Sequence, residues 1–276
     1  MPSWFFTMSM GLFGLLFGSF ANVVIWRVPR GESIAHPGSH CPACSTQIAW
    51  YDNIPVLSWL VLRARCRSCG AGIRVRYPIV ELASGALFVV AALAYGVGVR
   101  AVVAAAVFWL LLVLSVIDLD HLRLPNPLVA VLAALGLLAA LASQYASPLV
   151  GPLTYHVPVS GPLTGPLANA LAGAVLGAGV SAGTALLYGV VRKRRGLGMG
   201  DVKFLGALGL VLGPYVLLSI FLGSVIGMVV GLSGSRGVRL SEKRIPFGPW
   251  LAAGSVITAL HGPAIWAWYL RLVGLV

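Results

Sequence analysis

The chain is dominated by apolar segments of roughly membrane-spanning length, and this feature limits its fold more than any other. A helix needs about 20 apolar residues to cross the hydrocarbon core of a bilayer, and its backbone must satisfy its own hydrogen bonds there. Hydrophobic residues make up 59% of the chain and charged residues 9%. The sequence therefore predicts an all-α polytopic protein in a lipid bilayer, with about eight transmembrane helices at 4–26, 79–98, 101–117, 127–142, 166–191, 203–213, 214–233 and 247–264.

Residues 203–233 form the least regular part of this pattern. These 31 residues must enter the membrane and return around Gly213-Pro214, which leaves 11 residues for the first half. At about 1.5 Å per residue, that half is too short to span the bilayer upright. We expect a short or re-entrant helix after Asp201, surrounded by protein.

The distribution of Lys and Arg predicts the orientation of the chain. A net charge of +12 would suggest a nucleic-acid partner in a soluble protein, but here 17 of the 19 basic residues fall on one side if the N-terminus lies outside. The positive-inside rule makes that side the cytoplasm. We therefore expect no nucleic-acid partner, a place in the cytoplasmic (inner) membrane, and an external proline-rich loop at 143–165, to which we assign no function.

No basic residue precedes the first apolar segment, so we interpret it as a retained anchor rather than a signal peptide.

A soluble insert at 27–78 divides the chain into a first helix at 1–26, the insert itself, and a multi-helix membrane core at 79–276. The insert holds all four cysteines, in two Cys-x-x-Cys pairs that 21 residues separate: Cys41, Cys44, Cys66 and Cys69. Two such pairs on the reducing side of a membrane are typical of a zinc ribbon, and four thiolate ligands leave no open position for substrate. We expect structural zinc; a redox-active dithiol or unmetallated thiols are the alternative.

Acidic residues are rare in this chain, and two of them lie at the predicted cytoplasmic ends of membrane helices. Asp118 ends a long apolar run in "LLLVLSVIDLDH", and Asp201 follows the glycines of "GLGMGD". If the two helices pack together, the carboxylates meet at the membrane boundary and share one proton. Such a pair can deprotonate water with its ionised member and polarise a peptide carbonyl with its neutral member. The glycines at 196, 198 and 200 would let an extended substrate backbone approach.

Structural roles for these carboxylates remain open. Asp201 could cap the helix that follows it, or pair with Lys203 or with the basic cluster at 192–195. Asp120 is the alternative to Asp118 as the partner of Asp201. We prefer Asp118 because it lies two residues further from water.

Glu81 lies just inside the second predicted span, where an ionisable group needs a partner or a polar cavity. It could pair with Arg74 or Arg76, or it could line a polar substrate groove. The remaining acidic residues are most simply solvated: Glu32, Asp52 and Glu242.

In its motifs the chain resembles the bacterial type IV prepilin peptidases, which are membrane aspartic proteases of the GxGD type. The matching segments are "GSFANVVIWRVPRGES" at 18–33, the cysteine pairs with "WYDNIPVLSWL" between them, "RYPIVELASG" at 76–85, "IDLDHLRLPN" at 117–126, "GLGMGDVKFLGALG" at 196–209 and "IPFGPWLA" at 245–252. This resemblance implies an enzyme that removes the short basic leader from type IV prepilins or pseudopilins, after a glycine and on the cytoplasmic side. It also implies that Asp118 and Asp201 are the catalytic pair.

The same resemblance implies a second activity. Many family members methylate the new N-terminus from S-adenosylmethionine, and the zinc-binding insert accompanies that branch, so we expect methylation here. No glycine-rich nucleotide-binding signature places the S-adenosylmethionine site. By motif position alone, the candidate residues are Gly18, Asn22, Arg27 and Glu81.

Two other classes of function fit parts of the sequence. A proton-coupled transporter also uses intramembrane carboxylates, but it would place some near the bilayer midplane and show repeat symmetry, and neither is evident. A membrane-anchored zinc-ribbon binding module would require the cysteines for its function but would not require the aspartates.

Overall fold

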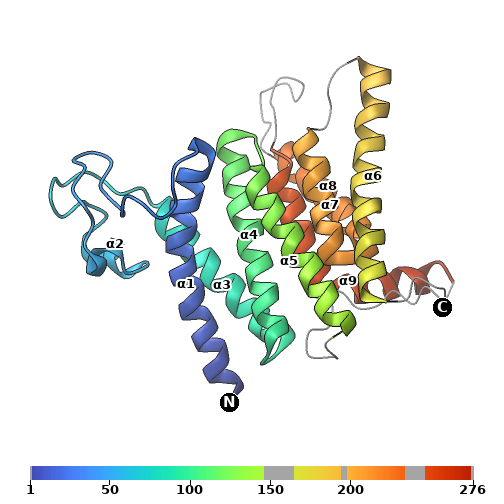
Figure 1. Cartoon of the computed structure of the whole chain (residues 1–276), viewed down its shortest axis with the longest axis horizontal. Helices are drawn as coiled ribbons and strands as arrows, with labels where there is room; N and C mark the ends of the chain where they lie inside the picture. The colour runs from blue at the N-terminus through green and yellow to red at the C-terminus, as the bar shows by residue number, and fades with distance from the viewer. Residues whose placement is uncertain (1, 146–164, 194–197, 234–245, 275–276) are drawn as a thin grey trace. The chain divides into compact units, whose positions relative to one another are not determined.

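The structure is a computed structural model that describes residues 2–145, 165–193, 198–233 and 246–274 (Figure 1). Most of the proline-rich loop, as well as Arg194, Arg195, Gly196 and Glu242, lies outside these residues. The described chain forms helices and no strands: α1 (Ser3–Arg27), α2 (Leu57–Val61), α3 (Arg76–Tyr95), α4 (Val99–His121), α5 (Asn126–Tyr145), α6 (Pro166–Arg192), α7 (Met199–Leu212), α8 (Val216–Ser233) and α9 (Gly248–Leu272). The chain divides into two compact units at Val116/Ile117, within α4.

The prediction of an all-α membrane protein is confirmed, and each of the eight predicted segments corresponds to one helix. Within the described residues, six stretches are long and apolar enough to cross a membrane: α1 with the turn after it, α3, α4, α5, α6, and Met199–Ser233, which holds both α7 and α8. The 25-residue α9 is not among the six. The protein is therefore a multi-pass membrane protein.

In the first unit, α1 and α3 pack closely through small residues. A side chain at Gly14 would come within 2.8 Å of the Gly85 Cα atom, and one at Gly18 within 2.5 Å of the Glu81 Cα atom. The Ser84 hydroxyl donates a hydrogen bond of 2.6 Å to the Gly14 carbonyl across this contact. Small residues at such spacing let two membrane helices approach until their backbones touch.

In the second unit, α7 is short and surrounded by protein, as expected. It has 14 residues, and its largest side chains are almost fully buried, among them Phe204, Leu205 and Leu208. It lies against α6 at an all-glycine contact, where a side chain at Gly209 would come within 2.1 Å of the Gly173 carbonyl oxygen. The helix begins at Met199 rather than after Asp201, so Asp201 lies in its first turn.

The chain reverses direction between α7 and α8, as the sequence predicts. Gly223 of α8 contacts Leu251, and Gly227 contacts Trp250, near the start of α9. The end of α8 and the start of α9 therefore lie together, at the same end of the unit as the start of α7, where Asp201 is found. A buried hydrogen bond of 3.0 Å between the Ser219 and Ser255 hydroxyls also joins α8 to α9.

Candidate active site and metal site

Asp118 lies in the last turn of α4 and is buried, with 6% of its surface exposed. Its Oδ2 atom accepts a hydrogen bond of 2.9 Å from the backbone N–H of Gly248, the first residue of α9. The first N–H groups of a helix have no partner within the helix and attract negative charge. A side chain at position 248 would come within 2.8 Å of the same carboxylate oxygen, so glycine is what allows this contact.

Asp201 lies in the first turn of α7, and its Oδ2 atom accepts a hydrogen bond of 3.1 Å from the Gly198 N–H. Asp201 therefore does cap the helix, which was one of the structural roles considered. The ammonium group of Lys203 instead donates to the Asn126 side chain at 3.2 Å, across to the start of α5. Among the described residues, Lys203 is thus not the partner of Asp201.

The structure brings Asp118 and Asp201 together in the second unit, near enough for their charges to interact. Each carboxylate receives an N–H from a glycine at the start of a helix, Gly248 for one and Gly198 for the other. Two like charges at short range are unfavourable, and sharing one proton relieves the repulsion. The pair can therefore consist of one ionised and one neutral carboxyl group.

Asp120 has a different environment from Asp118, although only one residue separates them. Asp120 and His121 are exposed at the end of α4, whereas Asp118 is buried against α9. The geometry thus favours Asp118 as the partner of Asp201. Gly248 belongs to the motif "IPFGPWLA", but the sequence analysis did not predict that Gly248 donates a hydrogen bond to Asp118. The Gly-Pro pair in this motif is typical of a helix start, and it was the sequence feature that could have indicated a backbone donor here.

The four cysteines form a cluster in which all Sγ atoms lie within 4.8 Å of one another. The Sγ atoms of Cys41 and Cys69 are 3.8 Å apart, close to the edge of about 3.8 Å that a tetrahedral zinc site with Zn–S bonds of about 2.3 Å requires. The cluster can hold a metal ion with four sulfur ligands.

The two Cys-x-x-Cys pairs adopt the same backbone turn. The N–H of Cys41 donates to the Thr46 carbonyl, and the N–H of Cys66 donates to the Ala71 carbonyl, which is the equivalent residue. The residue after each second cysteine has a positive φ angle, 58° at Ser45 and 71° at Gly70. Arg67 joins the second turn to Asp52 through two hydrogen bonds, of 2.6 and 2.8 Å, which lower the pKa of the Asp52 carboxyl.

The left-handed conformation of Gly70 leads to a prediction about metal retention. Gly70→Ala is expected to weaken the metal-bound form by about 1 kcal/mol, because an L-residue is disfavoured at this φ angle. Gly72→Ala is the matched control: neither position has a neighbouring atom within 4 Å, but only Gly70 has a positive φ. Titration with a competing chelator should release metal earlier from Gly70→Ala than from Gly72→Ala. Equal release from both variants would contradict the prediction.

The four candidates for S-adenosylmethionine binding lie in the first unit and have separate roles. Gly18 allows the close contact between α1 and α3. The side chain of Asn22 donates to the Tyr77 carbonyl at 3.2 Å. Arg27 is buried and binds carbonyl groups of the insert. Glu81 is also buried, and its carboxylate accepts a hydrogen bond of 2.8 Å from the backbone N–H of Val56.

Comparison with known proteins places the chain in a family. Residues 12–95 match the bacterial peptidase A24 N-terminal domain, and residues 105–232 match the type IV leader peptidase family. The chain belongs to the type IV leader peptidase family. It is therefore a peptidase, and both aspartates of the pair fall within the second matched region.

Two curated relatives match nearly the whole chain, and a third matches less than half of it. A type 4 prepilin-like proteins leader peptide-processing enzyme of Escherichia coli is 37% identical over 89% of this chain and 90% of its own length. A prepilin leader peptidase/N-methyltransferase of Stutzerimonas stutzeri is 36% identical over 95% of this chain and 93% of its own length. A protein of the same name in Myxococcus xanthus is 50% identical, over 45% of this chain and 38% of its own length. No solved structure gives a significant match.

Proposed function

We propose that this leader peptidase removes the short basic leader of type IV prepilins or pseudopilins, with Asp118 and Asp201 as its catalytic pair. The observation that carries the proposal is that two carboxylates from distant parts of the sequence lie near enough for their charges to interact, and that each accepts the backbone N–H of a glycine at the start of a helix. The names of the relatives in Escherichia coli and Stutzerimonas stutzeri support prepilins as the substrate class.

Peptide hydrolysis requires one group that takes a proton and one that gives it. In the proposed mechanism, the ionised carboxylate removes a proton from water, and the neutral carboxyl group donates a hydrogen bond to the scissile carbonyl. The N–H groups of Gly198 and Gly248 hold the two carboxylates in position. Gly198 and Gly200 leave room for an extended substrate backbone beside Asp201.

The purified protein, reconstituted with a membrane-inserted prepilin, provides the test of this function. The expected product is the mature pilin cut directly after the last glycine of the leader, identified by mass spectrometry of its new N-terminus. Addition of S-adenosylmethionine is expected to add one methyl group to that N-terminus. A protein that retains its metal and its fold but leaves the prepilin intact would refute the proposal.

The proposed active site faces the cytoplasm, and the N-terminus lies outside. The asymmetry of the basic residues supports this orientation in the inner membrane. A protease-sensitive tag inserted in the 143–165 loop is expected to be cut from outside the cell, whereas the same tag in the 27–78 insert should be protected. Cleavage of the insert tag from outside would reverse the orientation.

We further propose that the four cysteines bind a structural zinc ion that holds the insert together. Few apolar side chains of the insert are buried, so a metal can supply stability that packing does not. Purified protein is expected to contain about one zinc per chain, and Cys41→Ser is expected to lose it. Less than about half an equivalent of zinc, together with freely titratable thiols, would exclude this site.

Methylation of the new N-terminus is the second proposed activity. One supporting observation is the relative in Stutzerimonas stutzeri that is named prepilin leader peptidase/N-methyltransferase and matches 95% of this chain. The other is that the chain has all four cysteines of the insert. The methyl donor is S-adenosylmethionine.

A further inference from the structure

The short helix α2 has the opposite polarity to a helix on the surface of a soluble domain. Its apolar side chains Leu57, Leu60 and Val61 are 60%, 58% and 75% exposed. These three share one face, because residues three and four positions apart lie together on a helix. The serine of α2, Ser58, is instead buried, and its hydroxyl donates a hydrogen bond of 2.9 Å to the Tyr51 carbonyl. An exposed apolar face of this kind indicates an interaction with a protein or a membrane.

Two further exposed apolar residues precede α2. Trp50 is 81% exposed and Ile54 is 40% exposed. The Ile54 N–H donates to the Ser58 hydroxyl at 2.9 Å, so the segment before the helix lies against it. Tryptophan is enriched at membrane–water interfaces, where its ring meets both apolar and polar surroundings. We call the five exposed residues of this segment the apolar patch: Trp50, Ile54, Leu57, Leu60 and Val61.

Hydrogen bonds fix the segment that carries the apolar patch to α3. The Val56 N–H, one residue before α2, donates a hydrogen bond of 2.8 Å to the buried Glu81 carboxylate. Val56 has a φ angle of 62°, which is disfavoured for a β-branched residue, and the bond to Glu81 helps to hold it there. The indole N–H of Trp59 donates to the Ile73 carbonyl at 3.1 Å, three residues before α3 begins. The patch therefore keeps a defined place beside the spans of the first unit.

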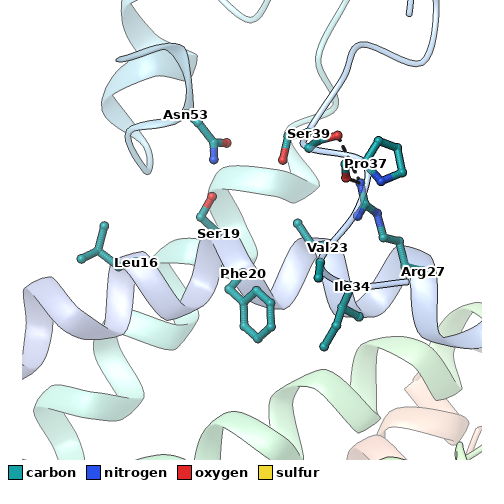
Figure 2. A pocket seen from close by; sticks show the side chains of 11 residues that line it. Leu16, Ser19, Phe20, Val23, Arg27, Ile34, Pro37, Ser39 and Asn53 are labelled. Carbon is teal, nitrogen blue, oxygen red and sulfur yellow. Dashed lines mark hydrogen bonds between the residues drawn. The ribbon is translucent and has the colours of Figure 1, made fainter. Parts of the chain in front are cut away.

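The position of this segment along α1 and α3 gives its depth in the membrane. In Figure 2, Asn53 of the insert points toward α1 beside Ser19, whereas Arg27 lies further along toward the helix end; all three line one cavity. Ser19 lies eight residues before Arg27, and Glu81 lies five residues after Arg76, the first residue of α3. At a rise of 1.5 Å per residue, these positions are about 12 and 8 Å below the basic ends of the two helices. Basic residues at the ends of spans lie near the membrane surface, so this segment reaches the boundary between headgroups and acyl chains.

Two exposed arginines, Arg63 and Arg65, follow α2 directly. The Arg63 N–H donates to the Leu60 carbonyl at 3.0 Å, so this turn lies at the end of the apolar patch. Long arginine side chains can extend from apolar surroundings to the headgroup layer. Asp52, the nearest acidic residue in the sequence, forms a salt bridge with Arg67. The edge of the patch is therefore positively charged and complements anionic headgroups.

We propose that the apolar patch enters the bilayer beside α1 and α3 and contacts acyl chains, while Arg63 and Arg65 bind the phosphates of anionic lipids. The insert is then only partly soluble, because its middle segment lies in the membrane surface. Lipid covers the apolar side chains that α2 exposes, and the buried bond between Val56 and Glu81 sets the depth of the segment. This inference does not depend on the proposed peptidase or methyltransferase activity.

Photochemical crosslinking of the full-length protein tests this inference in nanodiscs of equal parts phosphatidylcholine and phosphatidylglycerol, with and without a membrane-inserted prepilin. The photoreactive residue p-benzoylphenylalanine, which attacks nearby C–H bonds, replaces Leu60 or Val61 in separate variants. Ala43 is the control position, since it is exposed in the same insert but lies in the first cysteine turn. Mass spectrometry is expected to find phospholipid adducts at positions 60 and 61, at least about fivefold more than at 43. The unfolding temperature of each variant establishes that its fold is unchanged.

The headgroups of the adducts test the role of the arginines. Phosphatidylglycerol is expected to exceed its bulk share by about twofold or more, and Arg63→Gln/Arg65→Gln should return the adducts to the bulk ratio. A bulk ratio with both arginines present would overturn the role assigned to them. The absence of lipid adducts at both patch positions, or equal yields at position 43, would overturn the membrane contact. Adducts with prepilin in place of lipid would make the patch a protein-binding surface and the inference wrong.

Discussion

Asp118→Asn and Asp201→Asn are each expected to lower prepilin cleavage by roughly a thousandfold or more, because an amide cannot take a proton from water or pass one on. Asparagine keeps the size of the side chain and an oxygen that accepts the glycine N–H, so the contacts to Gly248 and Gly198 should persist. The measurement is the initial rate of cleavage of a membrane-inserted prepilin. Unfolding temperature and zinc content, measured for each variant, establish that the fold is unchanged.

Asp120→Asn is the matched control, since it lies two residues further along α4 and is exposed. It is expected to cut at close to the wild-type rate. Activity in Asp118→Asn together with loss of activity in Asp120→Asn would mean that the partner of Asp201 is Asp120. Activity in all three variants would mean that Asp118 and Asp201 serve only as helix caps, and it would remove the basis of the proposed mechanism.

Gly209→Ala is expected to destabilise the second unit by about 3 kcal/mol or more, at the upper end of the usual cost of overpacking. The added methyl group would lie 2.1 Å from the Gly173 carbonyl oxygen and 2.3 Å from its carbonyl carbon. These atoms belong to the backbone, so no flexible side chain can move aside and α6 and α7 must separate. Because α7 carries Asp201, prepilin cleavage should fall as well.

Gly179→Ala offers a matched control on α6, since a side chain there meets nothing within 4 Å. It is expected to leave stability unchanged or to raise it by as much as about 1 kcal/mol, because alanine favours helix more than glycine does. Thermal unfolding in the same detergent compares the two variants. Equal unfolding temperatures of Gly209→Ala and Gly179→Ala would contradict a close backbone contact between α6 and α7.

The helices could be predicted from sequence because lipid imposes a length and a composition on every span. The predicted ends were less accurate where charge or proline interrupts an apolar run. α7 begins at Met199, before Lys203, because Gly198 and Asp201 start the helix with their own backbone and side-chain hydrogen bonds. α9 continues through Pro263 to Leu272, past the predicted end at 264.

The cysteine cluster could be predicted because its ligands are close in sequence, in two short repeats of the same turn. The partners of the buried carboxylates could not, because they come from distant segments. Gly248 lies 130 residues after Asp118, and the Val56 N–H that binds Glu81 belongs to a different segment from Arg74 and Arg76, which were one of the two alternatives for Glu81. Local patterns mark such residues as costly to bury, but only the packing of whole helices decides which donor each one meets.

The contact between Asp118 and Gly248 also bears on when this enzyme becomes active during its synthesis. The ribosome completes both aspartates well before it reaches α9, so a growing chain holds the two acids while one of them still lacks its backbone donor. The Asp118 carboxylate gains this donor only after the chain has been made through α9 and α9 has packed beside α8. In the proposed mechanism, the catalytic pair is therefore incomplete until α9 is in place, which would protect neighbouring membrane proteins from premature cleavage.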